Sequence, residues 1–285
     1  MLSLLPLVSV QGWPVVRAQE PGSAHESKTG ETIWLMAGDL RLKVRAFRTA
    51  KIGESPVLVL VLHGDSPFRP PSYQHEFAQR ATAQLENVVV AALLRPGYCD
   101  EERDCSAGVR GLTTGDNYTP EVIDAVANVI GQLKTKYHAS SVLVAGHSGG
   151  AAIAADLIGR APSVAQGALL ISCPCDLRAW REHMFHRQAS NPIWLQPVRS
   201  LSPIDLASNV SVHTRVLLLV GSEDPIAPPD LTERYAAALE KDGISATVTV
   251  APGLEHDILL EPVAYEQLKA LVETVKKMRT SKAQG

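Results

Sequence analysis

The amino-acid sequence predicts an α/β fold: a doubly wound, mostly parallel sheet with an N-terminal antiparallel hairpin and helices on both faces. Three patterns lead to this prediction. Two alternating apolar–polar runs stand near the start, six continuous apolar runs follow them, and helical patterns lie between those six. Strands that alternate with helices along a chain are typical of a parallel sheet covered on both sides.

The alternating runs cover residues 32–36 and 40–47, on either side of Ala37-Gly38-Asp39. A period of two around a glycine-containing turn predicts an antiparallel hairpin. The continuous apolar runs follow at 57–62, 88–94, 142–145, 168–172, 216–220 and 247–250. Because a strand buried on both faces has no polar side, these six runs predict the parallel strands.

Helical patterns occupy residues 73–85, 120–136, 150–160, 230–241 and 263–278. Thr119 precedes Pro120, which is the arrangement of an N-cap followed by proline at the first helical position. One connection, 176–214, is long and has only short periodic runs. Long irregular inserts are often lids or pocket walls, so we interpret it as a small cap inserted into a domain that spans 32–280.

The N-terminal residues 1–18 have the pattern of a signal peptide, because a mostly apolar stretch ends in Val16-Arg17-Ala18. No Lys or Arg precedes this stretch, so an arm packed on the domain is the alternative. Residues 19–31 are polar and form a lead-in. Cleavage after Ala18 predicts a periplasmic or secreted protein, and an uncleaved chain predicts a cytoplasmic one. The apolar stretch is too short and too broken by proline and glycine for a membrane span.

The overall composition is that of a globular protein, with 285 residues, 45% apolar and 20% charged residues, and a formal net charge of −3. This charge gives no reason to expect a nucleic-acid partner. Cys99 and Cys105 lie in one predicted loop, where they are able to close a short ring. A bridge between Cys173 and Cys175 would be strained, so pairing across the two loops stays open. No cysteine pair has zinc-finger spacing, and no metal or cofactor is expected.

The strongest chemical signal is Gly146-His147-Ser148-Gly149-Gly150, which follows an apolar run and opens a helical pattern. A strand that turns sharply into a helix holds a serine in strained geometry and leaves no room for side chains beside it. Ser148 is therefore the predicted nucleophile, with a glycine-rich turn and an incidental serine as the alternative. The backbone N–H of Gly149 is expected to face a developing oxyanion at the helix N-terminus.

A serine hydroxyl needs a base, and the base needs an orienting acid. His256 follows the last apolar run, so it belongs to a loop at the carboxyl edge of the sheet, as Ser148 does. Asp224 follows the run at 216–220 and is the predicted acid. Asp176 follows the preceding run and competes with it. The chain order serine, acid, histidine favours Asp224.

The loop His63-Gly64-Asp65-Ser66 follows the run at 57–62 and is expected to supply the second oxyanion donor. The backbone N–H of Asp65 is the first candidate, and Ser66 is next and is also a candidate substrate contact. His63 is interpreted as a packed structural histidine because His256 already serves as the base.

Five motifs in this order resemble the α/β-hydrolase superfamily over residues 32–278. They are His63-Gly64, Arg95-Pro96-Gly97-Tyr98, the Ser148 motif, Gly221-Ser222-Glu223-Asp224-Pro225 and Gly253-Leu254-Glu255-His256. Ser202-Pro203-Ile204-Asp205 further resembles the prolyl-oligopeptidase and dienelactone-hydrolase branch. The dienelactone enzymes use a cysteine nucleophile, which differs from Ser148.

The first functional hypothesis is a serine hydrolase that cleaves small carboxylic esters through an acyl-enzyme. The alternatives are a small exported peptidase or amidase acting on short peptides, and a non-catalytic binding protein on the same fold. Trp180 and Trp194 are candidate substrate contacts in the cap, and packing inside the cap is the other interpretation of both. The sequence leaves the oligomeric state, the acyl chain length and the choice between ester and peptide open.

Overall fold

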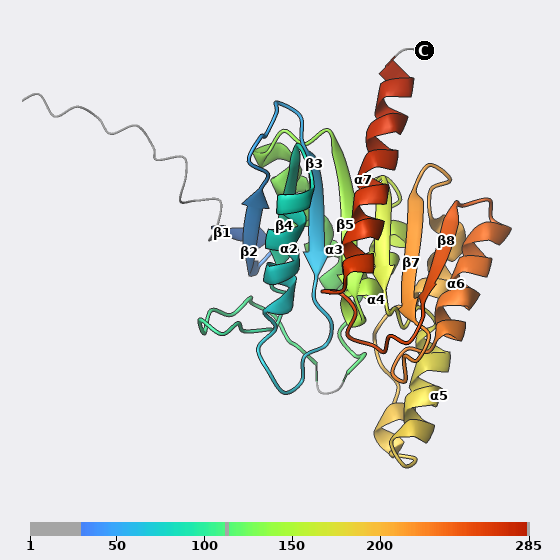
Figure 1. Ribbon diagram of the computed structural model, residues 1–285. Helices are drawn as coiled ribbons and strands as arrows, with labels where there is room; N and C mark the ends of the chain where they lie inside the picture. Colours follow the sequence, from blue (N-terminus) through green and yellow to red (C-terminus); the bar gives the residue numbers. More distant parts are fainter. Residues whose placement is uncertain (1–29, 112–113, 284–285) are drawn as a thin grey trace, which may run out of the picture.

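The computed structural model describes residues 30–111 and 114–283, and Figure 1 shows a central sheet with helices on both sides. The predicted signal peptide at 1–18 lies outside the described residues, as does nearly all of the predicted lead-in. Within the described part of the chain, no helix combines the length and apolar character that a membrane crossing requires.

The sheet has eight strands in the order β1-β2-β4-β3-β5-β6-β7-β8. The strands β1 and β2 form the predicted hairpin, β2 pairs antiparallel with β4, and every other pairing is parallel. The predicted fold is therefore confirmed. The strand bounds are β1 Glu31–Ala37, β2 Leu40–Arg48, β3 Val57–Leu62, β4 Val88–Leu93, β5 Ser141–His147, β6 Gly167–Ile171, β7 Arg215–Gly221 and β8 Ala246–Ala251.

Helices cover both faces because alternate residues of the central strands point to opposite sides and most of them are apolar. On one face lie α2 (Tyr73–Gln84) and α7 (Pro262–Ala283), in front of the sheet in Figure 1. Their aromatic side chains Phe77 and Tyr265 stack with ring centroids 4.8 Å apart. The other face is covered by α3 (Pro120–Lys136), α4 (Gly149–Arg160) and α6 (Pro229–Lys241).

The long connection at 176–214 contains one helix that the sequence did not predict, α5 (Leu177–Arg187), which extends past the carboxyl edge of the sheet (Figure 1). The side chain of Asp176 caps it by accepting a hydrogen bond from Ala179 N at 3.1 Å. Two 3₁₀ segments follow, η1 (Pro192–Leu195) and η2 (Pro203–Asn209), and η2 packs on α4.

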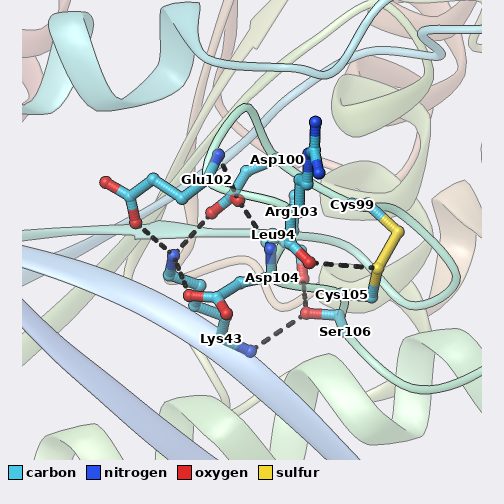
Figure 2. The surroundings of a disulfide bond; sticks show 9 residues. All are labelled: Lys43, Leu94, Cys99, Asp100, Glu102, Arg103, Asp104, Cys105 and Ser106. Atoms are coloured by element: carbon cyan, nitrogen blue, oxygen red, sulfur yellow. Dashed lines mark hydrogen bonds and ion pairs between the residues drawn. A yellow bond between two sulfur atoms is a disulfide. The ribbon is translucent and has the colours of Figure 1, made fainter.

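Both cysteine pairs are bridged locally, Cys99 to Cys105 and Cys173 to Cys175, so the alternative of pairing across the two loops is not what the structure has. Cys99 and Cys105 are exposed, and Figure 2 shows their bridge closing the loop beside Ser106. Cys173 and Cys175 are fully buried directly after β6.

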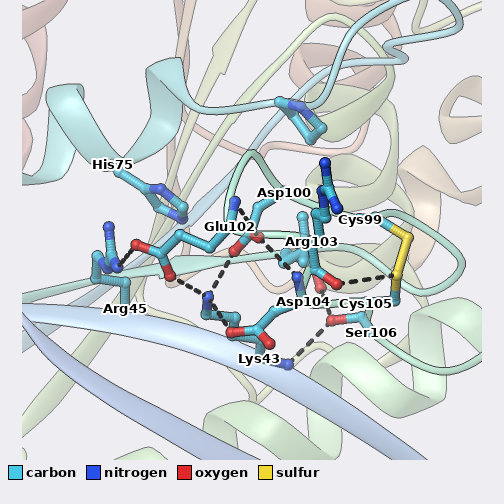
Figure 3. A network of polar contacts seen from close by, with 12 residues as sticks. Lys43, Arg45, His75, Cys99, Asp100, Glu102, Arg103, Asp104, Cys105 and Ser106 are labelled. Carbon is cyan, nitrogen blue, oxygen red and sulfur yellow. Dashed lines mark hydrogen bonds and ion pairs between the residues drawn. A yellow bond between two sulfur atoms is a disulfide. The ribbon is translucent and has the colours of Figure 1, made fainter.

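The loop closed by the first disulfide surrounds a buried lysine of β2 (Figure 3). The Lys43 ammonium donates to Asp100 at 2.6 Å, to Glu102 at 2.7 Å and to Asp104 at 2.7 Å. Burial on its own would lower the pKa of Lys43, but the hydrogen bonds from these carboxylates outweigh it and raise that pKa. The lysine therefore stays charged and ties the loop to the sheet.

Candidate active site

Ser148 lies between β5 and α4 with φ 54° and ψ −123°, a backbone conformation that residues other than glycine rarely adopt. The neighbouring glycines make the turn sterically feasible. A Cβ on Gly146 would overlap the carbonyl of Gly150, and a Cβ on Gly150 would overlap the carbonyls of Leu62 and His63. This tight turn places Ser148 at the N-terminus of α4, at the carboxyl edge of the sheet.

His256 lies in the loop after β8, and its Nε2 atom is 2.9 Å from the Ser148 hydroxyl oxygen. Its Nδ1 atom lies 2.8 and 2.9 Å from the two carboxylate oxygens of Asp224. Because an ionised carboxylate only accepts, the ring carries its proton on Nδ1, and the Nε2 lone pair faces Ser148. The arrangement suits proton abstraction from the serine.

The Asp224 side chain is fully buried and also accepts hydrogen bonds from the backbone N–H groups of Ile226 and Ala227, at 2.9 and 2.8 Å. Burial alone would raise the pKa of Asp224, but the hydrogen bonds from His256 and the two amides outweigh it, so its pKa is lowered. Asp176, the competing acid in the sequence, instead caps α5 and lies 3.8 Å from Arg234.

The predicted oxyanion residues Asp65 and Gly149 are neighbours, since a Cβ on Gly149 would lie 2.7 Å from the Asp65 carboxylate. Gly64 brings the loop against the nucleophile, because a Cβ there would lie 2.9 Å from the Cβ of Ser148. Among the residues that the structure describes, neither the Asp65 N–H nor the Gly149 N–H donates to a protein acceptor. These two amides therefore remain the candidates for the predicted oxyanion donors.

The Asp65 carboxylate lies against Gly149 and belongs to a buried polar cluster. It accepts hydrogen bonds from Tyr118 at 2.7 Å, from the Gly115 N–H at 2.9 Å and from Tyr98 at 3.3 Å, and it pairs with the fully buried Arg95 at 3.0 Å. The sequence motif around Arg95 had indicated the superfamily but not this pairing of Arg95 with Asp65.

His63 has the packed structural environment that the sequence suggested. Its Nδ1 lies 2.7 Å from the Gly64 carbonyl, and its Nε2 accepts a hydrogen bond from the Arg95 N–H at 3.1 Å. Complete burial, followed by the nearby Arg95 charge, holds the pKa of His63 well below its usual value. It therefore stays neutral and joins the ends of β3 and β4.

The predicted substrate contacts have different surroundings. The Ser66 hydroxyl donates to the Arg69 carbonyl at 2.5 Å within its own loop. Trp180 and Trp194 are buried, pack edge to face with centroids 5.4 Å apart, and Trp180 donates to the Ile226 carbonyl at 2.8 Å. The two tryptophans thus form the core of the cap. The cavity of about 330 Å³ beside His256 is lined instead by the following residues: Arg187, Pro225, Ile226, Leu254, Glu255, Asp257, Ile258 and Glu261.

The sequence did not predict three residues near the base: His147 and Ser172, which contact the His256 carbonyl, and Tyr73, which contacts His147. His147 Nε2 and the Ser172 hydroxyl each lie 2.9 Å from the carbonyl oxygen of His256. Tyr73 lies 3.0 Å from Nδ1 of His147. The sequence gives no local signal for these contacts, because the partners are far apart along the chain.

Two groups of side chains within the described residues are close enough to share a metal ion. In the first, His147 and His256 use their ring nitrogens in the hydrogen bonds described above, and Asp257 is exposed. In the second, the three carboxylates of the disulfide loop already surround the Lys43 ammonium. Neither group offers a preformed set of free ligands.

Solved structures share this fold at low sequence identity. Puromycin hydrolase is 19% identical with a TM-score of 0.71, over 92% of this chain and 41% of its own. The acylaminoacyl peptidase of Pyrococcus horikoshii is 17% identical with a TM-score of 0.65, over 87% of this chain and 42% of its own. Est1E of Butyrivibrio proteoclasticus, with ferulic acid bound, is 13% identical with a TM-score of 0.65, over 85% of this chain and 98% of its own.

The chain therefore spans about two fifths of the peptidase and puromycin hydrolase chains and nearly the whole of Est1E. No curated protein sequence matches it. The model of the prolyl oligopeptidase family matches residues 78–277, well over half of the chain and all of the site from Arg95 to His256. The chain belongs to the prolyl oligopeptidase family of α/β-hydrolase-fold serine hydrolases.

Proposed function

We propose that this protein is a serine hydrolase that cleaves small carboxylic esters through an acyl-enzyme formed on Ser148. The observation that carries the proposal is the hydrogen-bonded series Ser148–His256–Asp224, in which each donor faces an acceptor at 2.8–2.9 Å. Family membership and the hydrolase neighbours support serine hydrolase chemistry.

The reaction follows from these positions. The Ser148 oxygen attacks the acyl carbon while His256 Nε2 takes the hydroxyl proton, and Asp224 stabilises the imidazolium that forms. The backbone N–H groups of Asp65 and Gly149 bind the oxyanion. His256 then gives its proton to the leaving alcohol, and water attacks the acyl-enzyme by the same route in reverse.

Two neighbours favour different leaving groups. Est1E, with ferulic acid bound, matches this chain over 98% of its own length, which favours a small carboxylic acid derivative and the ester proposal. An acylaminoacyl peptidase has been solved in complex with Z-Gly-Gly-Phe-chloromethyl ketone, and the family is named after an oligopeptidase, which favours short peptides as the second candidate.

The test compares p-nitrophenyl esters of short acyl chains with aminoacyl p-nitroanilides. The ester proposal expects ester turnover in the wild type, loss of it in Ser148→Ala, and much weaker anilide turnover. Ser140→Ala is the matched control, since Ser140 precedes β5 at the opposite edge of the sheet. Comparable anilide turnover supports the peptide candidate. An inactive wild type whose Ser148 also fails to react with a fluorophosphonate contradicts both.

We also propose that the protein is exported and cleaved after Ala18. Two disulfides support this location, because such bonds persist in oxidising compartments. N-terminal sequencing of protein from the native host is expected to begin at Gln19. An intact Met1 on protein recovered from the cytoplasm contradicts export.

A further inference from the structure

A single chain of hydrogen bonds joins the oxyanion loop to the histidine loop, and the chemistry of its members fixes the direction of every bond. The carbonyl of His256 only accepts, so His147 Nε2, 2.9 Å away, carries a proton and donates it. A neutral imidazole with a proton on Nε2 has an acceptor at Nδ1. The Tyr73 hydroxyl, 3.0 Å from Nδ1, must therefore donate to it.

The oxygen of Tyr73 in turn accepts a hydrogen bond from the Gly64 N–H at 2.5 Å. The series runs without a break from Gly64 through Tyr73 and His147 to the His256 carbonyl. Gly64 immediately precedes the predicted oxyanion donor Asp65, so the two ends of the series belong to the two loops that must cooperate in the reaction. Aligned hydrogen bonds of this kind polarise and strengthen one another.

The surroundings keep both middle members in the required protonation state. His147 is 3% exposed, and burial, together with the charge that His256 acquires, lowers its pKa to about 4. Burial raises the pKa of Tyr73. His147 thus remains a neutral imidazole when His256, whose ring centre is 5.1 Å away, takes up the serine proton.

We propose that His147 and Tyr73 are positioning residues that hold the His256 loop in a fixed position relative to the oxyanion loop. They touch no reacting atom. The Ser172 hydroxyl donates to the same carbonyl at 2.9 Å, so the peptide carbonyl of His256 is held from the ends of two neighbouring strands. The proposal rests on the proposed function, since it assigns a task within the same reaction.

The kinetic test compares His147→Ala with His147→Gln, whose side-chain amide can restore the donor to the His256 carbonyl. Loss of the anchor misplaces the base, so kcat of His147→Ala is expected to fall by roughly 10- to 100-fold with KM within about twofold, because small misplacements of a catalytic group have effects of this size. His147→Gln is expected to recover most of kcat. His138→Asn, at the opposite edge of the sheet, is the matched control and is expected to match the wild type.

Tyr73→Phe provides a second test that preserves the shape of the side chain and removes only the hydroxyl. It is expected to lower kcat with KM unchanged even where His147→Ala fails to fold. Nitrogen NMR of labelled histidine, assigned through His147→Gln, is expected to show His147 neutral at pH 6 with its proton on Nε2.

Unchanged kcat in a folded His147→Ala or Tyr73→Phe overturns the proposal, as does a His147 proton on Nδ1. These outcomes differ from failure of the proposed function. In that case the wild type has no turnover and Ser148 is not labelled by a fluorophosphonate, whatever happens at His147.

Discussion

Replacing Lys43 by methionine tests how the disulfide loop is held on the sheet. The side chain keeps a similar length but loses its charge, while three carboxylates remain around it. Their exposure separates them. The side chain of Asp100 is 4% exposed, whereas Glu102 is 54% and Asp104 is 46% exposed. Water screens the last two, so their ion pairs contribute at most about 1 kcal/mol each.

The pair with Asp100 decides the magnitude, because breaking a buried ion pair leaves a charge without its partner and costs about 3–5 kcal/mol. Asp100 keeps two hydrogen bonds, from the backbone N–H groups of Glu102 and Asp104 at 3.0 and 3.1 Å. We therefore expect the lower end, about 3 kcal/mol of unfolding free energy, or a fall in Tm of roughly 6–12 °C for a domain of this size.

Urea unfolding followed by circular dichroism measures this change. Lys136→Met is the matched control. Lys136 pairs with Glu31 at 2.8 Å, but these side chains are 40% and 37% exposed, so a loss below about 1 kcal/mol is expected. A second variant that also carries Asp100→Asn is expected to regain part of the loss. A loss below about 1 kcal/mol in Lys43→Met would refute the reasoning that the buried pair is uncompensated.

The dependence of stability on acid pH provides a second test of the same ion pairs. The hydrogen bond from Lys43, followed by that from Arg45, lowers the pKa of Glu102 to about 2 from its usual 4.5. A carboxyl whose pKa is depressed by folding stabilises the protein above its unfolded pKa and loses that contribution as pH falls. Wild-type stability is expected to fall between pH 4.5 and 2 more steeply than that of Lys43→Met. Parallel curves in acid urea titrations contradict this.

Three further changes have definite expected results. Asp224→Asn removes the acceptor that fixes the His256 tautomer, so kcat for ester hydrolysis is expected to fall by about 10⁴-fold. Asp176→Asn is the control: asparagine still caps α5, so kcat in the same assay is expected to stay within about twofold of the wild type. Gly131→Ala places a methyl group in open space on α3 and is expected to add about 0.5–1 kcal/mol in urea unfolding; a loss of stability contradicts this. Replacing Cys99 and Cys105 by serine opens a bridge with a sequence separation of 6, and a loss of about 2 kcal/mol is expected, while an unchanged Tm contradicts the loop-closure estimate.

Local patterns carried most of the fold. The run at 57–62 coincides with β3, because a strand buried on both faces is a continuous apolar run in the sequence. The helix predicted at 120–136 coincides with α3, because an N-cap followed by proline marks its first residue. The helix α5 was missed. Its buried residues Leu177, Trp180, Arg181 and Met184 have the spacing of one helix face, but the run is short and lies in a long connection that has no other extended periodic segment.

The candidate site was predictable where a residue follows a recognisable strand. Ser148, Asp224 and His256 each lie in the turn or loop that follows such a strand. The sequence favoured Asp224 as the acid but kept Asp176 as a competitor, because both residues follow strands at the same edge, and only the three-dimensional path shows that Asp176 caps a helix. Tyr73 and His147 are 74 residues apart, and a contact between residues so distant in sequence produces no periodic pattern from which it could be predicted.

The two disulfides differ in what a reductant can reach. Cys99 and Cys105 stand at the surface, so thiols in the medium have access to their bridge at any time after folding. Cys173 and Cys175 are completely enclosed between β6 and α5, and exchange there requires the structure to open. We therefore expect a reductant in the medium to act on the outer bridge first, whereas the inner bridge is exchanged only when the structure around it opens.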